Sequence, residues 1–254
     1  MLVLRSCAVW AVLGLALAAV AVPASADVPG MKPIAAERQA ISGAWMVENP
    51  TPRMLTADGK PPPLKPAAAK LYKQRLALRT KGETWFDRAT WCASPGVPRA
   101  NVMPYPLEIV MDDRRVAFLY QWFRLYRLVD LSGMKQDVPY PISIGYGMGR
   151  WEGETLVIET IGLLGDTTLD AAGLPHSENM TLTERIRLID KDRLENRMTI
   201  NDPENYSRVW ETTATYKRLP GQHVQDDVCL DRIAAGEPAV KGDDALLPQA
   251  KGRK

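Results

Sequence analysis

Between Trp85 and Arg218 the sequence consists of short segments in which apolar and polar residues alternate, separated by turn residues. Such alternation is typical of strands with one buried face. The expected strands are Leu107–Met111, Arg115–Trp122, Arg124–Leu131, Met148–Trp151, Thr155–Ile161, Thr181–Ile189, Arg193–Ile200 and Ser207–Lys217. Tight links at 190–192 and 202–205 favour consecutive antiparallel pairing. We therefore predict a mainly β protein, an antiparallel meander that closes into a barrel of about eight strands, large enough for one small ligand.

An extended arm and a helix are expected before the barrel, over residues 27–82. The segment around Gly43–Val47 looks like an opening barrel strand that carries Trp45. Pro66 suits the first turn of a helix, and Gly82 can end it. The barrel domain is then expected over 83–235, and the polar residues 236–254 are expected to form a disordered tail.

Residues 1–26 have the pattern of a secretory signal peptide. Arg5 precedes an apolar run from Ala8 to Val22, and Ala24-Ser25-Ala26 has the small-x-small form of a cleavage site. The run is shorter than the roughly 20 residues of a membrane span, although a retained anchor is the alternative. We predict a periplasmic mature chain that starts at Asp27 and has no stable membrane insertion.

Export would leave two of the three cysteines, Cys92 and Cys229. Two cysteines in an oxidising compartment usually pair, and this pair would join an early loop to the C-terminal segment. Two free buried thiols are the alternative.

Composition excludes several classes of function. The formal charge of +2 comes with no basic stripe, so nucleic acid is not an expected partner. Phosphate-binding glycine loops, nucleophile elbows and H-E-x-x-H are missing, and the chain has only two histidines. We therefore expect neither a metal site nor another cofactor.

The segment from Gly149 to Ile186 gathers acidic, imidazole and hydroxyl groups between two expected strands. Glu184 falls in phase with the apolar residues of its strand, and burial would raise its pKa toward neutrality. The alternatives are a structural ion pair with one of three arginines, namely Arg124, Arg127 and Arg150, or a position at the barrel mouth that is open to water. We predict that Glu184 is a catalytic acid or base.

His176 lies in the turn Gly173–Ser177, where a histidine can move protons near neutral pH. Asp166 is a candidate to orient it, so both are expected catalytic residues. A loop histidine bonded to a backbone carbonyl is the alternative.

Other side chains are candidates for binding a substrate. Strand alternation places three of them in the barrel: Tyr120, Asn196 and Trp210. Arg99 and Tyr105 belong to a proline-rich loop that could reach over the barrel mouth, or that could be a structural lid. Glu159 and Arg185 complete the expected set, although Glu159 could equally be an exposed strand carboxylate.

Five ordered motifs resemble an exported bacterial family whose members are mostly labelled hypothetical. The motifs are C-x-x-P-G-x-P-R from Cys92, P-Y-P-x-E-I from Pro104, G-R-W-E-G-E-T-L-V from Gly149, G-x-P-H-S from Gly173 and T-E-R from Thr183. The resemblance covers about residues 42–229 and implies a lipocalin-like fold. The chain departs from the pattern at Leu182, where a second histidine is common, and at Gly165-Asp166, where an Asn-Asp pair is common.

Two functions follow from these residues. The first is a cofactor-free enzyme for a small hydrophobic or aromatic compound, in which His176 and Glu184 transfer protons. Such a site would suit a lyase, a hydratase or dehydratase, or an isomerase. The second is a periplasmic carrier with the same pocket and no turnover.

Overall fold

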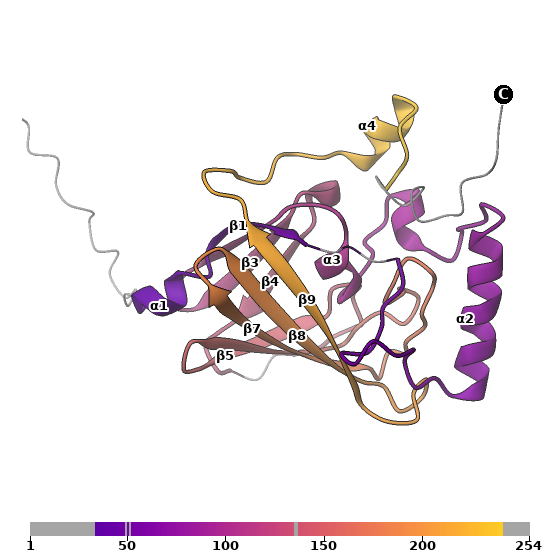
Figure 1. Cartoon of the computed structure of the whole chain (residues 1–254), viewed down its shortest axis with the longest axis horizontal. Coiled ribbons are helices and arrows are strands. Elements are labelled where there is room, and N and C mark those ends of the chain that lie inside the picture. Colours follow the sequence, from indigo (N-terminus) through magenta and orange to yellow (C-terminus); the bar gives the residue numbers. More distant parts are fainter. Residues whose placement is uncertain (1–33, 49, 51, 135–136, 241–254) are drawn as a thin grey trace, which may run out of the picture. The chain divides into compact units, whose positions relative to one another are not determined.

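A computed structural model describes residues 34–48, 50, 52–134 and 137–240. The expected signal peptide and residues 241–254 lie outside the described residues. Nine strands form a closed barrel in chain order, as Figure 1 shows. They are β1 Gly43–Val47, β2 Leu107–Met111, β3 Arg115–Tyr120, β4 Tyr126–Asp130, β5 Tyr146–Glu152, β6 Thr155–Ile161, β7 Thr181–Asp190, β8 Arg193–Asn201 and β9 Trp210–Arg218. The helices are α1 Ala36–Gln39, α2 Pro66–Arg79, α3 Arg99–Val102 and α4 Cys229–Ala234, with 3₁₀ turns η1 Arg88–Trp91 and η2 Trp122–Arg124.

The predicted mainly β closed barrel is confirmed, with one difference in strand direction. Neighbouring strands pair antiparallel, except that β4 and β5 run parallel through Val129↔Gly147 and Asp130↔Met148. The long connection from Leu131 to Gly145 carries the chain back before β5 begins, which a parallel pair requires. β1 pairs with both β2 and β9 and thereby closes the barrel of nine strands.

Alternation along the strands fills the barrel with side chains. On β8 the inward positions Leu194, Asn196, Met198 and Ile200 are all buried, while the residues between them face outward. Trp45 on β1 is fully buried and donates from Nε1 to the carbonyl of Ile41 at 3.0 Å. The core is therefore continuous from the first strand to the last.

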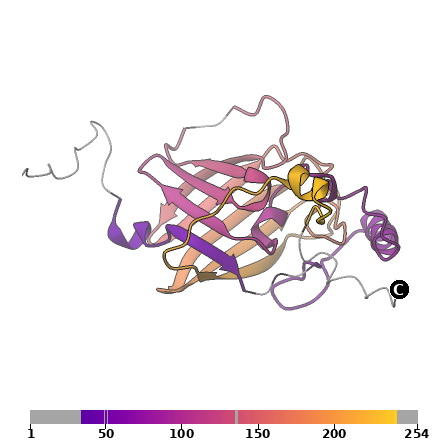
Figure 2. The same cartoon turned by 90° about the horizontal axis from the view of Figure 1, so that it is seen from above.

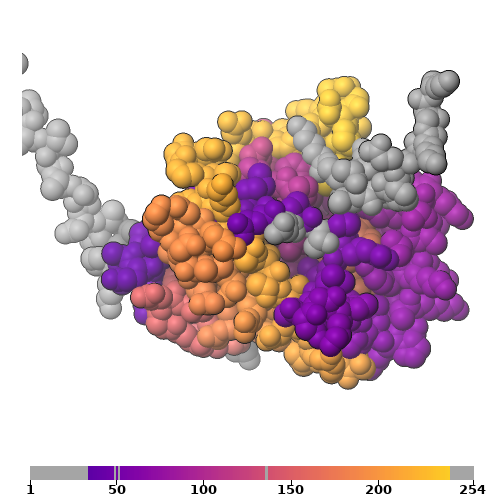
Figure 3. All heavy atoms as spheres, in the orientation of Figure 1, coloured from indigo at the N-terminus to yellow at the C-terminus, as the bar shows by residue number. Residues whose placement is uncertain are grey.

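The N-terminal arm lies against the barrel between β9 and α2, where Figure 3 shows it in dark purple. The Ala57 amide donates to the Glu211 carbonyl at 2.7 Å, and Leu64 forms a β-bridge with Tyr206. α2 is held by Tyr72, whose hydroxyl donates to the buried carboxylate of Asp170 at 2.8 Å. These contacts attach both N-terminal segments to the barrel.

After β9 the chain crosses the outside of β1 and β2 toward α4 (Figure 2). The Val224 amide donates to Glu108 at 3.2 Å, and the Cys92–Cys229 disulfide then joins α4 to η1. The predicted disulfide is thus confirmed. Ala239 and Val240 pack in the cluster beside the disulfide, and Val240 is buried, although the tail was expected to begin at Gly236. Within the described part of the chain, no helix is long and apolar enough to cross a membrane.

Candidate functional site

Five buried polar residues meet inside the barrel and form what we call the barrel-centre group: Asn101, Tyr120, Arg127, Glu184 and Asn196. Arg127 Nη2 lies 2.5 Å from Glu184 Oε2, and neither side chain is accessible to solvent. Asn101 and Asn196 both donate from Nδ2 to Glu184 Oε1, at 2.8 and 3.0 Å. The Tyr120 hydroxyl donates to Asn101 Oδ1 at 2.6 Å. Glu184 Oε1 therefore accepts two hydrogen bonds, while among the described residues Oε2 has only the ion-pair contact with Arg127.

Four of these residues come from strands and one from a short helix. Tyr120, Arg127, Glu184 and Asn196 occupy inward positions of β3, β4, β7 and β8. Asn101 belongs to α3, which lies at the end of the barrel nearest α2 in Figures 1 and 2. The Asn101 carbonyl accepts a hydrogen bond from the Tyr216 hydroxyl of β9 at 2.8 Å, so α3 is fixed to the barrel wall.

Charge pairing outweighs desolvation at Arg127. Burial alone would lower the pKa of its guanidinium, but the Glu184 carboxylate and the neighbouring Tyr120 raise that pKa above its ordinary value. Burial also raises the pKa of Tyr120, so its phenol stays protonated. The group therefore contains one fixed ion pair and neutral hydrogen-bonding side chains.

Some N–H donors of the Arg127 guanidinium have no acceptor among the described residues. Thr160 Oγ1 accepts from Arg127 Nη2 at 2.6 Å, but Nε and Nη1 make no hydrogen bond to any described residue. Buried polar groups in native proteins nearly always have a partner, and a missing one costs about 1–3 kcal/mol. Trp210 Nε1 is likewise buried without a partner in the described chain. These donors can take an acceptor from a small molecule.

The structure brings together three of the expected site residues, Glu184, Tyr120 and Asn196. Trp210 faces the same interior from β9, where its ring packs 5.3 Å from that of Tyr206. The ion pair considered as the alternative for Glu184 is present, and Arg127 is its partner.

His176 and Asp166 do not join this group. His176 is buried, with Nε2 2.6 Å from Thr167 Oγ1 and Nδ1 3.0 Å from the Ser177 carbonyl. A carbonyl only accepts, so Nδ1 carries the proton and Nε2 accepts from Thr167. Burial lowers the pKa of His176. Asp166 is exposed and pairs with Arg88 rather than with the imidazole.

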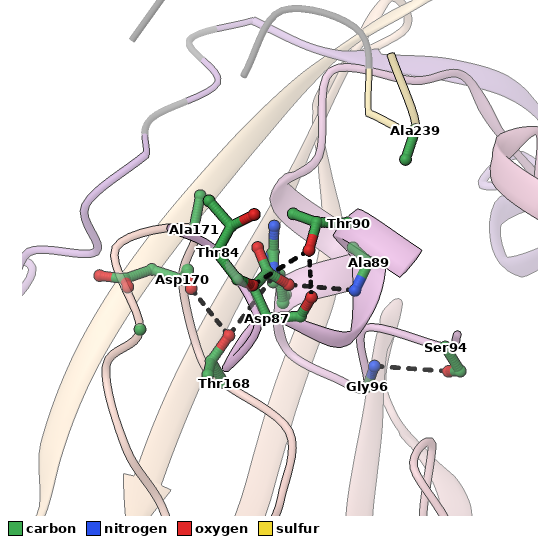
Figure 4. Close-up of polar contacts among 12 residues, drawn as sticks. Thr84, Asp87, Ala89, Thr90, Ser94, Gly96, Thr168, Asp170, Ala171 and Ala239 are labelled. Carbon is green, nitrogen blue, oxygen red and sulfur yellow. Dashed lines mark hydrogen bonds and ion pairs between the residues drawn. The ribbon is translucent and has the colours of Figure 1, made fainter. Parts of the chain in front are cut away.

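Arg99 lies outside the barrel centre, although it is buried. It pairs with Asp87, which also lies 3.5 Å from Arg79 of α2. Figure 4 shows Asp87 surrounded by Thr84, Ala89 and Thr90, and Asp87 Oδ1 accepts from the Ala89 amide at 3.1 Å. This cluster connects α2, η1 and α3, and thereby positions the helix that carries Asn101.

The remaining expected binding residues also lie elsewhere. Tyr105 packs in the cluster around the disulfide. Glu159 and Arg185 face outward and form ion pairs with Arg150 at 2.7 Å and Glu152 at 2.8 Å. Their outward direction follows from alternation, because each is one residue away from an inward position.

Sequence reasoning missed Asn101 as a site residue and gave Arg127 only as a possible partner. The segment around Arg127 is apolar on both faces, so its inward phase could not be chosen from the sequence. Asn101 reaches Glu184 only because α3 folds into the barrel end, and no periodic signal marks such a contact.

The fold and the interior group define a closed β-barrel with a charged, hydrogen-bonded centre. No protein-family model matches the sequence, and no curated protein matches it. The resemblance to an exported lipocalin-like family therefore stays a prediction. Within the described residues, no three His, Cys, Asp or Glu side chains lie together as metal ligands would.

Proposed function

We propose that the protein is an exported, periplasmic carrier that holds a small molecule inside its barrel at the barrel-centre group. The observation that supports this most is the buried Arg127 guanidinium, whose Nε and Nη1 donors have no acceptor among the described residues. A ligand acceptor at this point would remove the desolvation cost of two N–H groups.

The same group suggests the chemistry of the ligand. Glu184 already balances the charge of Arg127, so a second buried carboxylate would be left uncompensated. A neutral acceptor such as a carbonyl or a phenol oxygen suits the site better. The apolar side chains that surround the group favour a hydrophobic or aromatic body.

Export is supported by the signal-like pattern of residues 1–26 and by the Cys92–Cys229 disulfide, since such bonds persist in oxidising compartments.

An acid–base enzyme, either a lyase, a hydratase or dehydratase, or an isomerase, is the second candidate. It is favoured by the presence of a carboxylate inside the barrel, because Glu184 accepts from Asn101 and the same amide accepts from the Tyr120 hydroxyl, which places an acid–base group among polar side chains. The carrier ranks first because Glu184 is engaged in a buried ion pair with Arg127 and His176 lies with Thr167, outside the group.

Native mass spectrometry of the mature protein, purified from the periplasm of its own host, tests the proposal. We expect the wild type to retain a small molecule and the double variant Arg127→Met with Glu184→Leu to lose it. Replacing both charges avoids leaving one of them buried alone. Arg115→Gln, an exposed position on the outside of β3, serves as the control that retains the molecule.

A double variant that folds and retains the molecule as the wild type does would contradict the proposed site. An empty wild-type barrel would contradict a carrier loaded in the periplasm. If the wild type converts the extracted molecule with repeated turnover, the enzyme replaces the carrier.

A further inference from the structure

Three arginines line a pocket on the outer face of β7 and β8, together with Thr155 and Glu195. They are Arg185, Arg187 and Arg197, and we call this pocket the arginine groove. It lies on the other face of the strand that carries Glu184, because adjacent strand residues point to opposite sides. The groove is thus separate from the barrel-centre group.

Two of these arginines are direct cross-strand neighbours, since Arg185 on β7 is in register with Arg197 on β8. Side chains in such positions have Cβ atoms about 4.5–5.5 Å apart, and like charges there destabilise a sheet. The same row across the sheet continues through Val157 on β6 to Arg150 on β5. This row therefore contains three guanidinium groups and no carboxylate.

The carboxylates around the groove are already engaged. Glu195 lies 2.9 Å from Arg187, and Glu152 accepts from both Arg185 and Arg150. Arg197 is exposed and makes no ion pair with any residue that the structure describes. The arginine groove contains two more cationic side chains than anionic ones. This excess of positive charge lies beside the Arg185–Arg197 pair.

We propose that the arginine groove binds a phosphate oxyanion between Arg185 and Arg197. Guanidinium groups bind phosphate through paired, charge-assisted N–H···O bonds, and the anion would cancel the cross-strand repulsion. The Thr155 hydroxyl at the edge of the groove can donate a further hydrogen bond. The chemistry fits a free phosphate, a soluble phosphate monoester or a phospholipid head group.

Calorimetric titration of the mature protein with inorganic phosphate, at constant ionic strength set with chloride, tests this inference. We expect Arg197→Gln to raise the dissociation constant for phosphate about tenfold, because one charge-assisted contact is lost. Arg115→Gln is the matched control, since Arg115 is an exposed strand arginine that faces Asp130 across the sheet instead of another arginine. It is expected to bind phosphate like the wild type.

Thermal unfolding gives an independent readout. In dilute chloride buffer we expect Arg197→Gln to melt about 1–3 °C above the wild type, because cross-strand repulsion is removed. Added phosphate should raise the melting temperature of the wild type more than that of Arg197→Gln. The difference in melting temperature between the two proteins should therefore become smaller. Arg115→Gln should show no such gain.

Two further titrations distinguish the sources of the anion. Binding of glycerol phosphate without co-sedimentation on phosphatidylglycerol vesicles assigns a soluble ligand, and co-sedimentation that phosphate reverses assigns a lipid head group. The absence of phosphate binding by the wild type, or equal binding by Arg197→Gln and the wild type, would overturn the inference.

Discussion

At the scale of single residues, the stability of the barrel interior depends on which group compensates each buried charge. Arg127 and Glu184 are both inaccessible to solvent, and each depends on the other to offset the cost of burial. Among the described residues, His176 has no such counter-charge in contact, and its ring bonds there only to Thr167 and the Ser177 carbonyl. The two buried sites should therefore respond differently to pH.

Acidification should destabilise the protein through His176. Burial lowers the pKa of this imidazole below its ordinary 6.5, although Asp202 and Asp166 oppose the shift and Arg75 adds to it. As the pH falls, the unfolded chain takes up the proton before the folded chain does. The stability that the neutral ring contributes is thus complete above about pH 6.5 and is lost as the pH falls toward the folded-state pKa.

Urea unfolding at a series of pH values between about 7.5 and 5 measures this effect. The free energy of unfolding of the wild type should fall more steeply than that of His176→Gln, which keeps hydrogen-bonding groups but does not titrate. Parallel curves for the two proteins would show that His176 is not the group responsible.

The sequence predicted the inward direction of Glu184 because β7 alternates cleanly between apolar and polar residues. The same alternation places Arg185 outside, so its assignment to the substrate could have been excluded from the sequence alone. Arg127 was ambiguous because both faces of its strand are apolar. The role of Asn101 could not be predicted from the sequence, since its position depends on how α3 packs into the barrel.

At the scale of elements, the junction of β4 and β5 is the least extensive in the barrel wall, with two residue pairs in register. Glycines on β5 allow this close approach. A Cβ atom at Gly149 would lie 2.6 Å from Leu131 Cδ2 and 2.8 Å from Val129 Cγ1, closer than atoms can pack. The glycine-rich run before Arg150 therefore allows the parallel strands β4 and β5 to pack closely against each other.

Gly149→Ala should push β4 and β5 apart and cost about 1–3 kcal/mol of unfolding free energy, the usual range for overpacking. Urea unfolding measures the loss, and hydrogen exchange of the β4 and β5 amides should show where it falls. Gly165→Ala is the control with the smaller expected loss, because its added Cβ would lie 3.0 Å from Glu178 Cγ and 3.2 Å from the Glu178 amide nitrogen, both farther away than the atoms met at Gly149. If Gly165→Ala lost as much unfolding free energy as Gly149→Ala, a specific requirement for glycine between β4 and β5 would be contradicted.

At the scale of the whole molecule, one covalent bond spans most of the barrel sequence. The Cys92–Cys229 disulfide joins positions 137 residues apart, and strands β2 to β9 all lie within that loop. Because it restricts the unfolded chain over such a length, the bond should contribute strongly to stability.

Replacing both cysteines with serine should cost about 3–5 kcal/mol of unfolding free energy. Guanidinium unfolding of the oxidised wild type, the reduced wild type and the double variant measures this cost. Reduction should bring the wild type to the level of the variant and leave the variant itself unchanged. An equal midpoint for the oxidised wild type and the variant would refute the stabilising role.

The position of β1 also determines when the barrel can close. This strand pairs with β2 on one side and with β9 on the other, so its second partner is the last strand to be synthesised. Contacts between such distant segments carry a large loop-closure entropy and form late. A nascent chain that lacks β9 has an open wall with unpaired edges, so the complete barrel forms only after Arg218 has emerged.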